Sequence, residues 1–322
     1  MNIAMISKWH VHAEGYAQSL QAVPGCKVTA VWNEDEADGR KWAEALGCQY
    51  VPSLDDVLND PQIDAVAINA PTSDHKDILI RAADAGKAIF TEKVLTLTKA
   101  DALEVKQAIE RNNTRFAISF PHKCFAPLQF AKKLLDDGKL GQVTYARVRN
   151  VHNGSIAGWL PPHFYDPKQC GGGAMIDLGA HPMYTLAWLL GRPKCVTSVF
   201  TNVTDHDVED NAVCVLTFDD GAIGVSETGF VSTNNPYTLE ISGTKGALMV
   251  HNGVFYCCDE TNGEWVEAKD LPDELPAPVE QWGRAAQTGE ALPEFDIDQA
   301  VLLSEIMEAA YKAHREGCVK EV

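Results

Sequence analysis

Short apolar runs alternate with longer amphipathic stretches over the first 120 residues, and this alternation constrains the fold more than any other feature. The apolar runs predict strands over residues 3–6, 28–32, 65–69, 88–91 and 115–120. The stretches between them predict helices, among them 13–20, 34–46, 74–85 and 99–111. Strands separated by helices require right-handed crossovers and a parallel sheet with helices on both faces. We therefore expect an α/β domain with a doubly wound parallel sheet, whose ligand binds at the carboxyl ends of the strands.

The pattern changes after Phe120. Helices are predicted over 126–137, 174–190 and 296–315, and strands over 196–203, 212–218, 223–228, 237–242 and 247–250. The Asp-Asp-Gly sequence at 219–221 is typical of a hairpin turn. A chain of 322 residues exceeds one typical core. We therefore predict a C-terminal α+β domain with a large, mostly antiparallel open sheet, and we place the boundary between residues 121 and 122.

Charge and composition narrow the function classes. The chain has 27 basic and 45 acidic residues, a formal net charge of -18, and no cluster of Lys and Arg. Such a surface disfavours nucleic acid and anionic membranes. No secretory signal and no apolar window of about 18 residues is found. Nine scattered cysteines without a C-x-x-C pair suggest reduced thiols. We expect a cytoplasmic protein.

The segment GGGAMIDLGAHPMY, residues 171–184, carries the strongest chemical signal. Asp177 and His181 are four residues apart and would share one face of the predicted helix. A histidine can act as a general base near neutral pH, and a carboxylate one turn away can orient it. A structural Asp–His pair that caps a loop explains the spacing equally well.

Two further segments end at the predicted ligand edge of the first sheet. GKAIFTEKV, residues 86–94, is a strand that ends in Glu92 and Lys93, and a lysine there can neutralise a phosphate or polarise a hydroxyl. INAPTSDH, residues 68–75, is a strand that stops at Asn69, with a turn fixed by Pro71. Surface lysines are common, and ordinary topology also explains the second segment.

Taken in order, these segments resemble the Gfo/Idh/MocA family of NAD(P)-dependent oxidoreductases, which includes glucose–fructose oxidoreductase and inositol dehydrogenase. The resemblance extends over almost the whole chain and is carried by DAVAINAPTSDH, AGKAIFTEKV, LLDDGKLGQV, GGGAMIDLGAHPMY and ALPEFDIDQAVLLSEIMEAAYKAHREG. It implies a dinucleotide-binding Rossmann domain over 1–121 and a substrate-binding and oligomerisation domain over 122–322. It also implies a homodimer or homotetramer formed through the C-terminal sheet.

The resemblance implies hydride transfer between a secondary hydroxyl of a sugar, polyol or related carbohydrate and a nicotinamide cofactor. Lys93 matches the lysine of the family's Glu-Lys-Pro motif and would be catalytic or orient the substrate. Asp177 and His181 match its helix motif, with His181 as the base that takes the hydroxyl proton. Two alternatives remain open, namely a redox-assisted lyase or glycosidase with tightly held NAD, and a non-catalytic carbohydrate or nucleotide sensor.

The chain departs from the family pattern near the expected cofactor. The three glycine positions of the dinucleotide fingerprint hold Ser7, Trp9 and His12. The start of the following helix still favours anions, and Lys8, His10 or His12 could contact phosphate. We expect a dinucleotide to bind by these means, the alternative being a cleft that has lost its nucleotide.

Three other positions also differ from the family. Val94 replaces the proline of the Glu-Lys-Pro motif, and Tyr184 stands where an aspartate is frequent. His122 and Lys123 occupy positions where an Asn/Tyr-Arg pair is common.

NAD is favoured over NADP. Asn33 ends the second strand, where an acidic residue would accept the ribose hydroxyls, but Glu34 and Asp35 follow it without a neighbouring arginine for a 2′-phosphate. The residues predicted to bind the cofactor are Ser7, Trp9, His10, His12, Asn33, Asn69, Pro71, His75 and Glu92. Those predicted to bind the substrate are Lys93, Lys123, His152, Trp159, His163, Tyr165, Asp177, His181 and Tyr184.

No metal site is expected. Several histidines suggest one, but only His10 and His12 are close in sequence. No H-x-x-x-H or cysteine pair supports a closed site.

Overall fold

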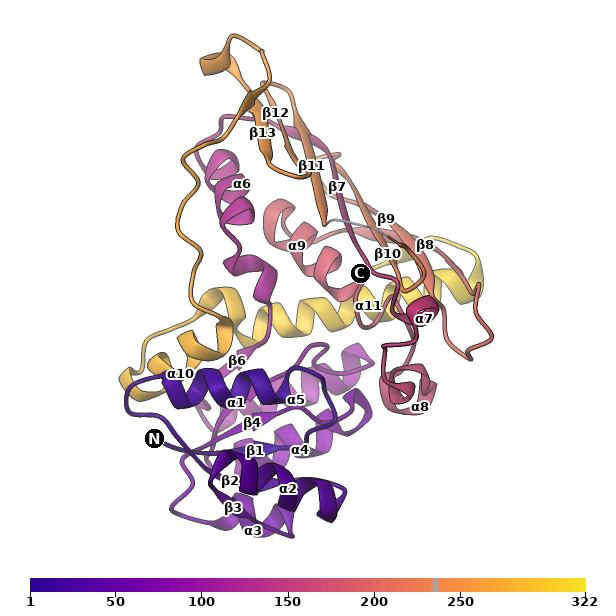
Figure 1. Ribbon diagram of the computed structural model, residues 1–322. Coiled ribbons are helices and arrows are strands. Elements are labelled where there is room, and N and C mark those ends of the chain that lie inside the picture. Colours follow the sequence, from indigo (N-terminus) through magenta and orange to yellow (C-terminus); the bar gives the residue numbers. More distant parts are fainter. Residues whose placement is uncertain (234–236) are drawn as a thin grey trace. The chain divides into compact units, whose positions relative to one another are not determined.

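A computed structural model describes residues 1–233 and 237–322 (Figure 1). The chain forms two compact units, the first from Met1–Phe120 and Pro276–Ser304 and the second from Pro121–Leu275 and Glu305–Val322. Residues 276–304, which we had assigned to the C-terminal domain, therefore pack with the first unit. The reason is α10 (Pro278–Thr288), which buries Trp282 against Phe90 with their ring centroids 5.7 Å apart.

The first unit contains a six-stranded parallel sheet in the order β3-β2-β1-β4-β5-β6. Its strands are β1 (Asn2–Ile6), β2 (Lys27–Trp32), β3 (Gln49–Tyr50), β4 (Ala65–Ile68), β5 (Ala88–Thr91) and β6 (Phe116–Ile118). Residues 3–6 of β1 and all of β4 are buried, as expected for strands covered by helices on both faces. The doubly wound parallel sheet is confirmed.

The helices around this sheet are α1 (Ala13–Ala22), α2 (Glu36–Leu46), α3 (Leu54–Asn59), α4 (Thr72–Asp84) and α5 (Lys99–Arg111). α4 packs against α5, and α1 packs against α10 (Figure 1). Side-chain caps fix three helix starts, because Asp35, Ser53 and Thr98 each accept a hydrogen bond from a backbone N–H three residues later. The short elements β3 and α3 were not predicted.

The second unit contains a nine-stranded sheet in the order β14-β13-β12-β11-β7-β10-β9-β8-β15. Its strands are β7 (Val143–Val151), β8 (Cys195–Thr201), β9 (Asn211–Thr217), β10 (Ile223–Gly229), β11 (Thr238–Gly243), β12 (Ala247–Val250), β13 (Val254–Cys257), β14 (Val266–Glu267) and β15 (Lys320–Glu321). Among the described residues β7 and β10 pair in parallel and the other strand pairs are antiparallel. The mostly antiparallel sheet is confirmed, as is the hairpin at 219–221 between β9 and β10.

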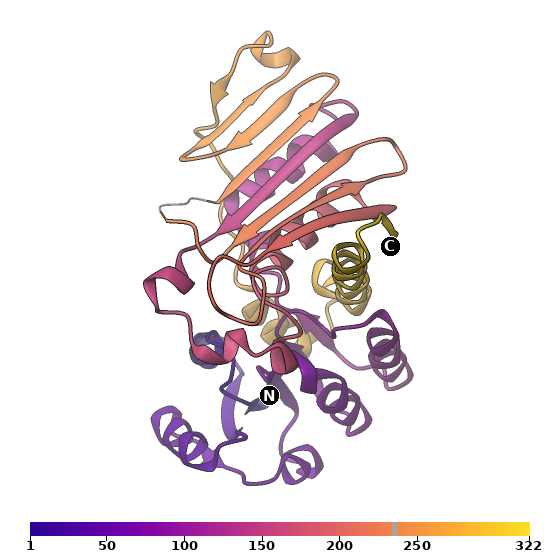
Figure 2. The same cartoon turned by 90° about the vertical axis from the view of Figure 1, so that its right-hand side faces the viewer.

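One face of this sheet is covered by helices and the other is open (Figure 2). α9 (Ala180–Leu190) packs on β7 and β10. The other helices that contribute to the unit are α6 (Ala126–Asp136), α7 (Gly154–Ala157), α8 (Pro167–Cys170) and the second half of α11 (Ile297–Glu316). Short 3₁₀ segments are Pro121–Cys124, Pro162–Tyr165 and Asp259–Thr261 here, and Pro293–Phe295 in the first unit.

The helix predicted over 174–190 begins only at Ala180, which corrects the prediction for Asp177. Residues 174–179 form turns, because Glu209 binds the amides of Ala174 and Met175 at the start of this segment. The amides of Gly173 and Met175 each donate to the Glu209 carboxylate over 3.0 Å. Asp177 therefore precedes α9, and the argument that it shares a helix face with His181 is wrong.

None of the helices in the described part of the chain is long and apolar enough to span a membrane.

Candidate active site

The turn after β1 closes without glycine. Ser7 has a backbone φ of 67°, in the left-handed region that glycine normally occupies. Its hydroxyl donates to Glu34 Oε2 over 2.8 Å and accepts from the Trp9 amide over 3.1 Å. The Lys8 amide donates to Asn33 Oδ1 over 2.7 Å. Side-chain hydrogen bonds thus replace the glycines that sequence reasoning expected.

Three predicted cofactor residues instead serve to join loops. The buried Asn69 side-chain amide donates to the backbone carbonyl of Ala67 over 3.2 Å, and the Asn69 backbone carbonyl accepts from the His10 amide over 3.1 Å. Asn33, besides bonding Lys8, donates to the Asp35 carbonyl over 2.9 Å. Pro71 is buried at the N-cap of α4. A direct cofactor contact by these side chains stays a prediction.

His75 is also buried, and both of its ring nitrogens face backbone carbonyls. Nε2 lies 3.0 Å from the Ala70 oxygen, and Nδ1 lies 3.0 Å from that of Val94 and 3.2 Å from that of Leu95. Burial lowers the pKa of His75, although these carbonyls act in the opposite direction. The ring therefore joins the loops after β4 and β5, and its contact with the cofactor stays a prediction.

Glu92 is the centre of the polar cluster at this edge, with only 1% of the residue exposed. Its Oε1 lies 2.8 Å from His12 Nδ1 and 3.4 Å from His10 Nδ1, and it accepts a hydrogen bond from the Tyr16 hydroxyl. Its Oε2 accepts from the Lys93 amide over 2.9 Å. Burial acts to raise the pKa of Glu92, but His10, His12 and Lys93 hold it well below its usual range. The carboxylate is therefore ionised at neutral pH.

The cluster brings together residues that are far apart in sequence. One ring nitrogen of each of His10 and His12 and one Glu92 oxygen lie within 4.8 Å of one another. The half-buried Trp9 lies beside them, its ring centroid 6.3 Å from that of His10. Lys93 follows Glu92 directly, is 5% exposed, and is joined to Val94 by a cis peptide bond. Sequence reasoning missed Tyr16, because no motif marks it.

This edge suits a dinucleotide in two respects. The first-turn amides of α1 have no partners within the helix, and His12 at its N-cap forms no side-chain cap bond, so an anion can bind there. The exposed Glu34 carboxylate at the end of β2 is placed to accept ribose hydroxyls, and partial desolvation raises its pKa. A Cβ atom on Gly15 would meet no protein atom within 4 Å.

In the second unit, His181 is held by Tyr184. The Tyr184 hydroxyl lies 2.9 Å from His181 Nδ1 and accepts a hydrogen bond from the His122 backbone amide over 3.0 Å. The His122 ring stacks on His181 with centroids 4.3 Å apart. Tyr184 is only 3% exposed and contacts the histidine, and its contact with the substrate stays a prediction. His122 was not among the predicted site residues.

The glycines before this histidine are required by packing. A Cβ on Gly172 would lie 2.0 Å from the Tyr311 hydroxyl, and one on Gly173 would lie 2.1 Å from the Glu209 carbonyl oxygen. Tyr311 in turn donates to Glu209 Oε1 over 2.6 Å. Glu209 and Tyr311 therefore shape the loop that leads to His181, and no local sequence pattern indicated them.

Four of the remaining predicted substrate residues fall into two neighbouring groups, which share the apolar cluster of Phe164 and Phe230. The first is His152, whose ring stacks on buried Phe230 at 4.9 Å and lies 4.6 Å from the Trp159 ring. Trp159 is 55% exposed, as a sugar-stacking residue requires. Burial lowers the pKa of His152, while the Asp177 carboxylate acts to raise it. Asp177 thus acts electrostatically on His152.

The second group surrounds Tyr165. Its hydroxyl lies 2.9 Å from Ser155 Oγ, and its ring stacks on His206 with centroids 3.5 Å apart. His163 is half-buried two residues earlier, with its ring 5.0 Å from that of Phe164. Lys123 is fully buried, with Nζ 5.7 Å from the centre of the Trp188 ring. Substrate binding by these residues stays a prediction.

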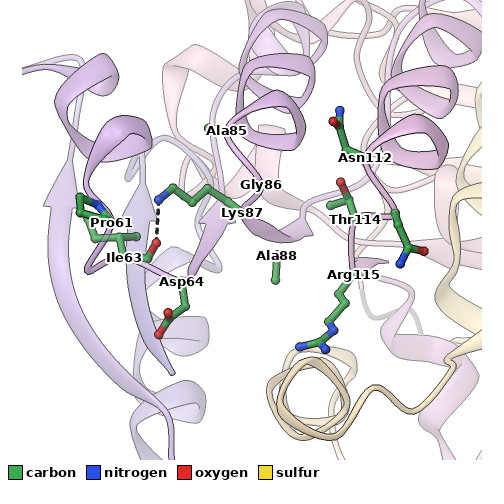
Figure 3. Close-up of a pocket in the computed structure, with 11 residues that line it drawn as sticks. Pro61, Ile63, Asp64, Ala85, Gly86, Lys87, Ala88, Asn112, Thr114 and Arg115 are labelled. Atoms are coloured by element: carbon green, nitrogen blue, oxygen red, sulfur yellow. Dashed lines mark hydrogen bonds between the residues drawn. The ribbon is translucent and has the colours of Figure 1, made fainter.

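A cavity of about 570 Å³ lies at the opposite edge of the first sheet (Figure 3). It is lined by residues at the amino ends of the strands, including Asp64, Ala88 and Arg115. Lys87 beside it donates to the carbonyls of Asp60 and Ile63, each over 2.7 Å. Since doubly wound sheets bind ligands at their carboxyl ends, this cavity is not the candidate site.

Comparisons with known proteins agree with this architecture. A family model described as "Oxidoreductase family, NAD-binding Rossmann fold" matches residues 5–120, and one for the GFO/IDH/MocA C-terminal domain matches residues 128–249. Scyllo-inositol 2-dehydrogenase (NAD(+)) of Bacillus subtilis is 29% identical over 253 residues, which are 75% of this chain and 70% of the relative. D-xylose 1-dehydrogenase (NADP(+)) 2 of Haloferax volcanii is 27% identical over 305 residues, 92% of each chain.

A solved structure extends the match to three dimensions. GenD2 from gentamicin A biosynthesis, in complex with NAD, superposes with a TM-score of 0.86 at 25% identity and covers 100% of this chain and 96% of its own. Fold and site thus define an oxidoreductase with a Rossmann unit and an α+β unit. The chain belongs to the Gfo/Idh/MocA family, whose N-terminal part is an NAD-binding Rossmann fold.

Proposed function

We propose that the protein is an NAD-dependent dehydrogenase that oxidises a secondary hydroxyl of a sugar, polyol or related carbohydrate. The observation that carries the proposal is the match of both units to one oxidoreductase family in a chain that retains Lys93 at the ligand edge and a held His181. Relatives named for inositol and xylose point to the substrate class.

The contact between Tyr184 and His181 suggests a role for each imidazole nitrogen. In the tautomer in which Nδ1 carries the ring proton and donates to the Tyr184 oxygen, 2.9 Å away, Nε2 would take the substrate's hydroxyl proton. Lys93 is proposed to orient the substrate. The nicotinamide supplies the acceptor for the hydride that leaves the hydroxyl-bearing carbon, so that the alcohol becomes a carbonyl. Asp177 is proposed to set the charge around His152 and to help bind the substrate.

The choice of NAD over NADP rests on Glu34. Its carboxylate lies at the end of β2, where it can accept two ribose hydroxyls and would repel a 2′-phosphate. The Asn33 side chain is occupied within the turn, so Glu34 takes the role that an acidic residue plays at this position.

Calorimetric titration of the purified protein with NAD, NADH, NADP and NADPH tests the proposal, after a check for cofactor carried through purification. We expect one NAD(H) pair to bind, followed by NADH formation with a sugar or polyol. Lys93→Ala and His181→Ala should lower kcat by about 10²–10⁴-fold while NAD affinity is kept. Lys27→Ala and His251→Ala, at exposed positions, are the matched controls.

Failure to bind any of the four nucleotides, with none already bound, would favour the sensor alternative. Tightly held NAD with substrate conversion but no net NADH would favour the redox-assisted lyase or glycosidase.

A homodimer or homotetramer formed through the open sheet face is part of the proposal. Val199 and Val213 pair across β8 and β9 and are 66% and 43% exposed. Beside them Arg147 forms a two-pronged ion pair with Glu227, at 2.7 and 2.8 Å. Light scattering should show an oligomer, and Val199→Lys should weaken it.

A cytoplasmic location is likewise proposed. All nine cysteines are free thiols, as expected for a protein in a reducing compartment. Fractionation of expressing cells tests this proposal, and recovery of disulfide-linked protein would contradict it.

A further inference from the structure

We propose that His10, His12 and Glu92 bind one divalent transition-metal ion in the turn between β1 and α1. Each residue offers one ligand atom, and these atoms converge within 4.8 Å although Glu92 is 80 residues from His12. The three residues belong to the first unit alone, so the site is complete within it.

The spacing of the ligand atoms fits a single ion. In a tetrahedral site with bonds of about 2.1 Å, ligand atoms lie about 3.4 Å apart. Here His10 Nδ1 and His12 Nδ1 lie 3.4 and 2.8 Å from Glu92 Oε1, and the three ligand atoms lie within 4.8 Å of one another. His10 Nδ1 also accepts a hydrogen bond from the His12 amide over 3.3 Å. Binding of the ion therefore requires the imidazole rings to turn, so that His10 exchanges this hydrogen bond for a bond to the metal.

The surroundings hold the carboxylate in place, as ligand-orienting groups do in metal sites. The Lys93 amide donates to Glu92 Oε2 over 2.9 Å, and the Tyr16 hydroxyl donates to Oε1. Tyr16 is itself fixed, because its oxygen lies 2.7 Å from Ser119 Oγ.

Burial is graded across the site. Glu92 and His10 are 1% and 5% exposed, whereas the His12 side chain is 46% exposed. His12 thus forms the solvent side, through which an ion can reach the buried ligands.

Two imidazoles and one carboxylate select the class of ion. This donor set suits Zn²⁺, Co²⁺ or Fe²⁺ better than Mg²⁺ or Ca²⁺, which prefer oxygen ligands. Three protein ligands leave a coordination position open for an oxygen ligand. The ion would add positive charge to a chain of net charge -18. It would do so in the turn where the pyrophosphate is proposed to bind. This link between the ion and the pyrophosphate rests on the proposed function.

Metal binding by the full-length protein, dialysed against a chelator, tests the site. Co²⁺ titration followed by visible absorption, with Zn²⁺ competition, should show one equivalent with nitrogen and oxygen ligation. His12→Ala should weaken binding by at least about 10–100-fold. His12 forms no side-chain cap bond, so this variant should fold, and circular dichroism checks it. Glu92→Gln should have the same effect, and His251→Ala, at an exposed loop position, is the control.

Equal affinity in the wild type and His12→Ala, or absorption bands of cobalt–thiolate bonds alone, would overturn the proposal. NAD titration with Zn²⁺-loaded and with chelated protein distinguishes failure of the metal site from failure of the proposed function. NAD binding without any metal binding would reject the metal site and leave the proposed function standing. Metal binding with unchanged NAD affinity would confirm the site and reject its link to the pyrophosphate.

Discussion

The turn after β1 and the loop before α9 use glycine in opposite ways. In the turn, where a dinucleotide fold normally has three glycines, Ser7 adopts the left-handed backbone itself and closes the bend with its hydroxyl. In the loop, Gly172 and Gly173 leave room for Tyr311 and for the Glu209 backbone, which a Cβ would hit at 2.0 and 2.1 Å.

This contrast separates two meanings of a glycine motif. A glycine can be replaced where its only task is a backbone angle, provided that side-chain hydrogen bonds stabilise that angle. It cannot be replaced where neighbouring atoms occupy the space of a Cβ. The missing fingerprint therefore does not by itself remove nucleotide binding, whereas the glycine run of the second unit is a packing requirement.

The largest expected effect is that of Gly173→Ala. The new Cβ would meet a backbone oxygen, so the loop or Glu209 must shift, and we expect a loss of about 3 kcal/mol in the free energy of unfolding. Gly15→Ala in α1 is the matched control, because its Cβ meets nothing within 4 Å, and it should be neutral or stabilise by up to about 1 kcal/mol. Urea unfolding measures the free energy of unfolding of both variants. An equal change in the two variants would show that packing does not require glycine at position 173.

Tyr184→Phe tests whether the loop in fact leads to a positioned base. Loss of the hydroxyl frees His181 Nδ1 and the His122 amide, so we expect kcat to fall about tenfold, the equivalent of one hydrogen bond. The pH profile of kcat should move as well, while KM changes little. A raised KM with unchanged kcat would indicate that Tyr184 binds the substrate and does not position His181.

His75 makes the first unit sensitive to acid. Its folded pKa lies below 6.5, so below that pH the unfolded chain binds more protons than the native one. The stability contributed by the neutral ring is complete above pH 6.5 and is lost as the pH falls toward the folded pKa. Unfolding free energies measured across this range should fall less steeply in His75→Gln, whereas His251→Gln should follow the wild type.

The smallest expected effect is the difference in stability between two variants of Ser7, which measures the cost of its left-handed backbone. Ser7→Ala and Ser7→Gly both remove the hydrogen bonds to Glu34 and Trp9, but only glycine relieves the positive φ. Ser7→Gly should therefore be more stable than Ser7→Ala by about 1 kcal/mol in thermal unfolding. A glycine variant no more stable than the alanine variant would show that the turn stores no such strain.

The sequence predicted most of the fold because buried strands and helices show recognisable patterns of apolar residues. Buried parallel strands such as β4 are continuous apolar runs, and α5 has the predicted bounds 99–111. The two-residue β3 is too short to show such a pattern. β7 alternates only around Ala146 and Val148, because its register with β11 shifts between Val143 and Tyr145, and this interrupted pattern was missed. α10 also has a readable apolar face at Trp282, Ala285 and Ala286.

The candidate site was less predictable, since its partners meet only through tertiary structure. Glu92 reaches His12 because β5 lies two strands from β1 in the sheet, and Glu209 reaches Gly173 from a different strand-to-strand connection. Motif resemblance predicted Lys93 and His181 as catalytic site residues, and both assignments stay predictions. No motif identifies Tyr16, Glu209 or Tyr311, because each acts through a contact between distant parts of the chain.

The return of residues 276–304 to the first unit has a consequence for biosynthesis. β1 is the first strand to leave the ribosome, but the partner that buries Phe90, Trp282, emerges only after the whole of β7 to β14 has been made. The nucleotide-binding unit therefore completes its core late in translation, with its apolar surface exposed until then. A gene fragment that encodes only residues 1–121 should yield an aggregation-prone product, and transplanting this unit into another enzyme requires both of its separated segments.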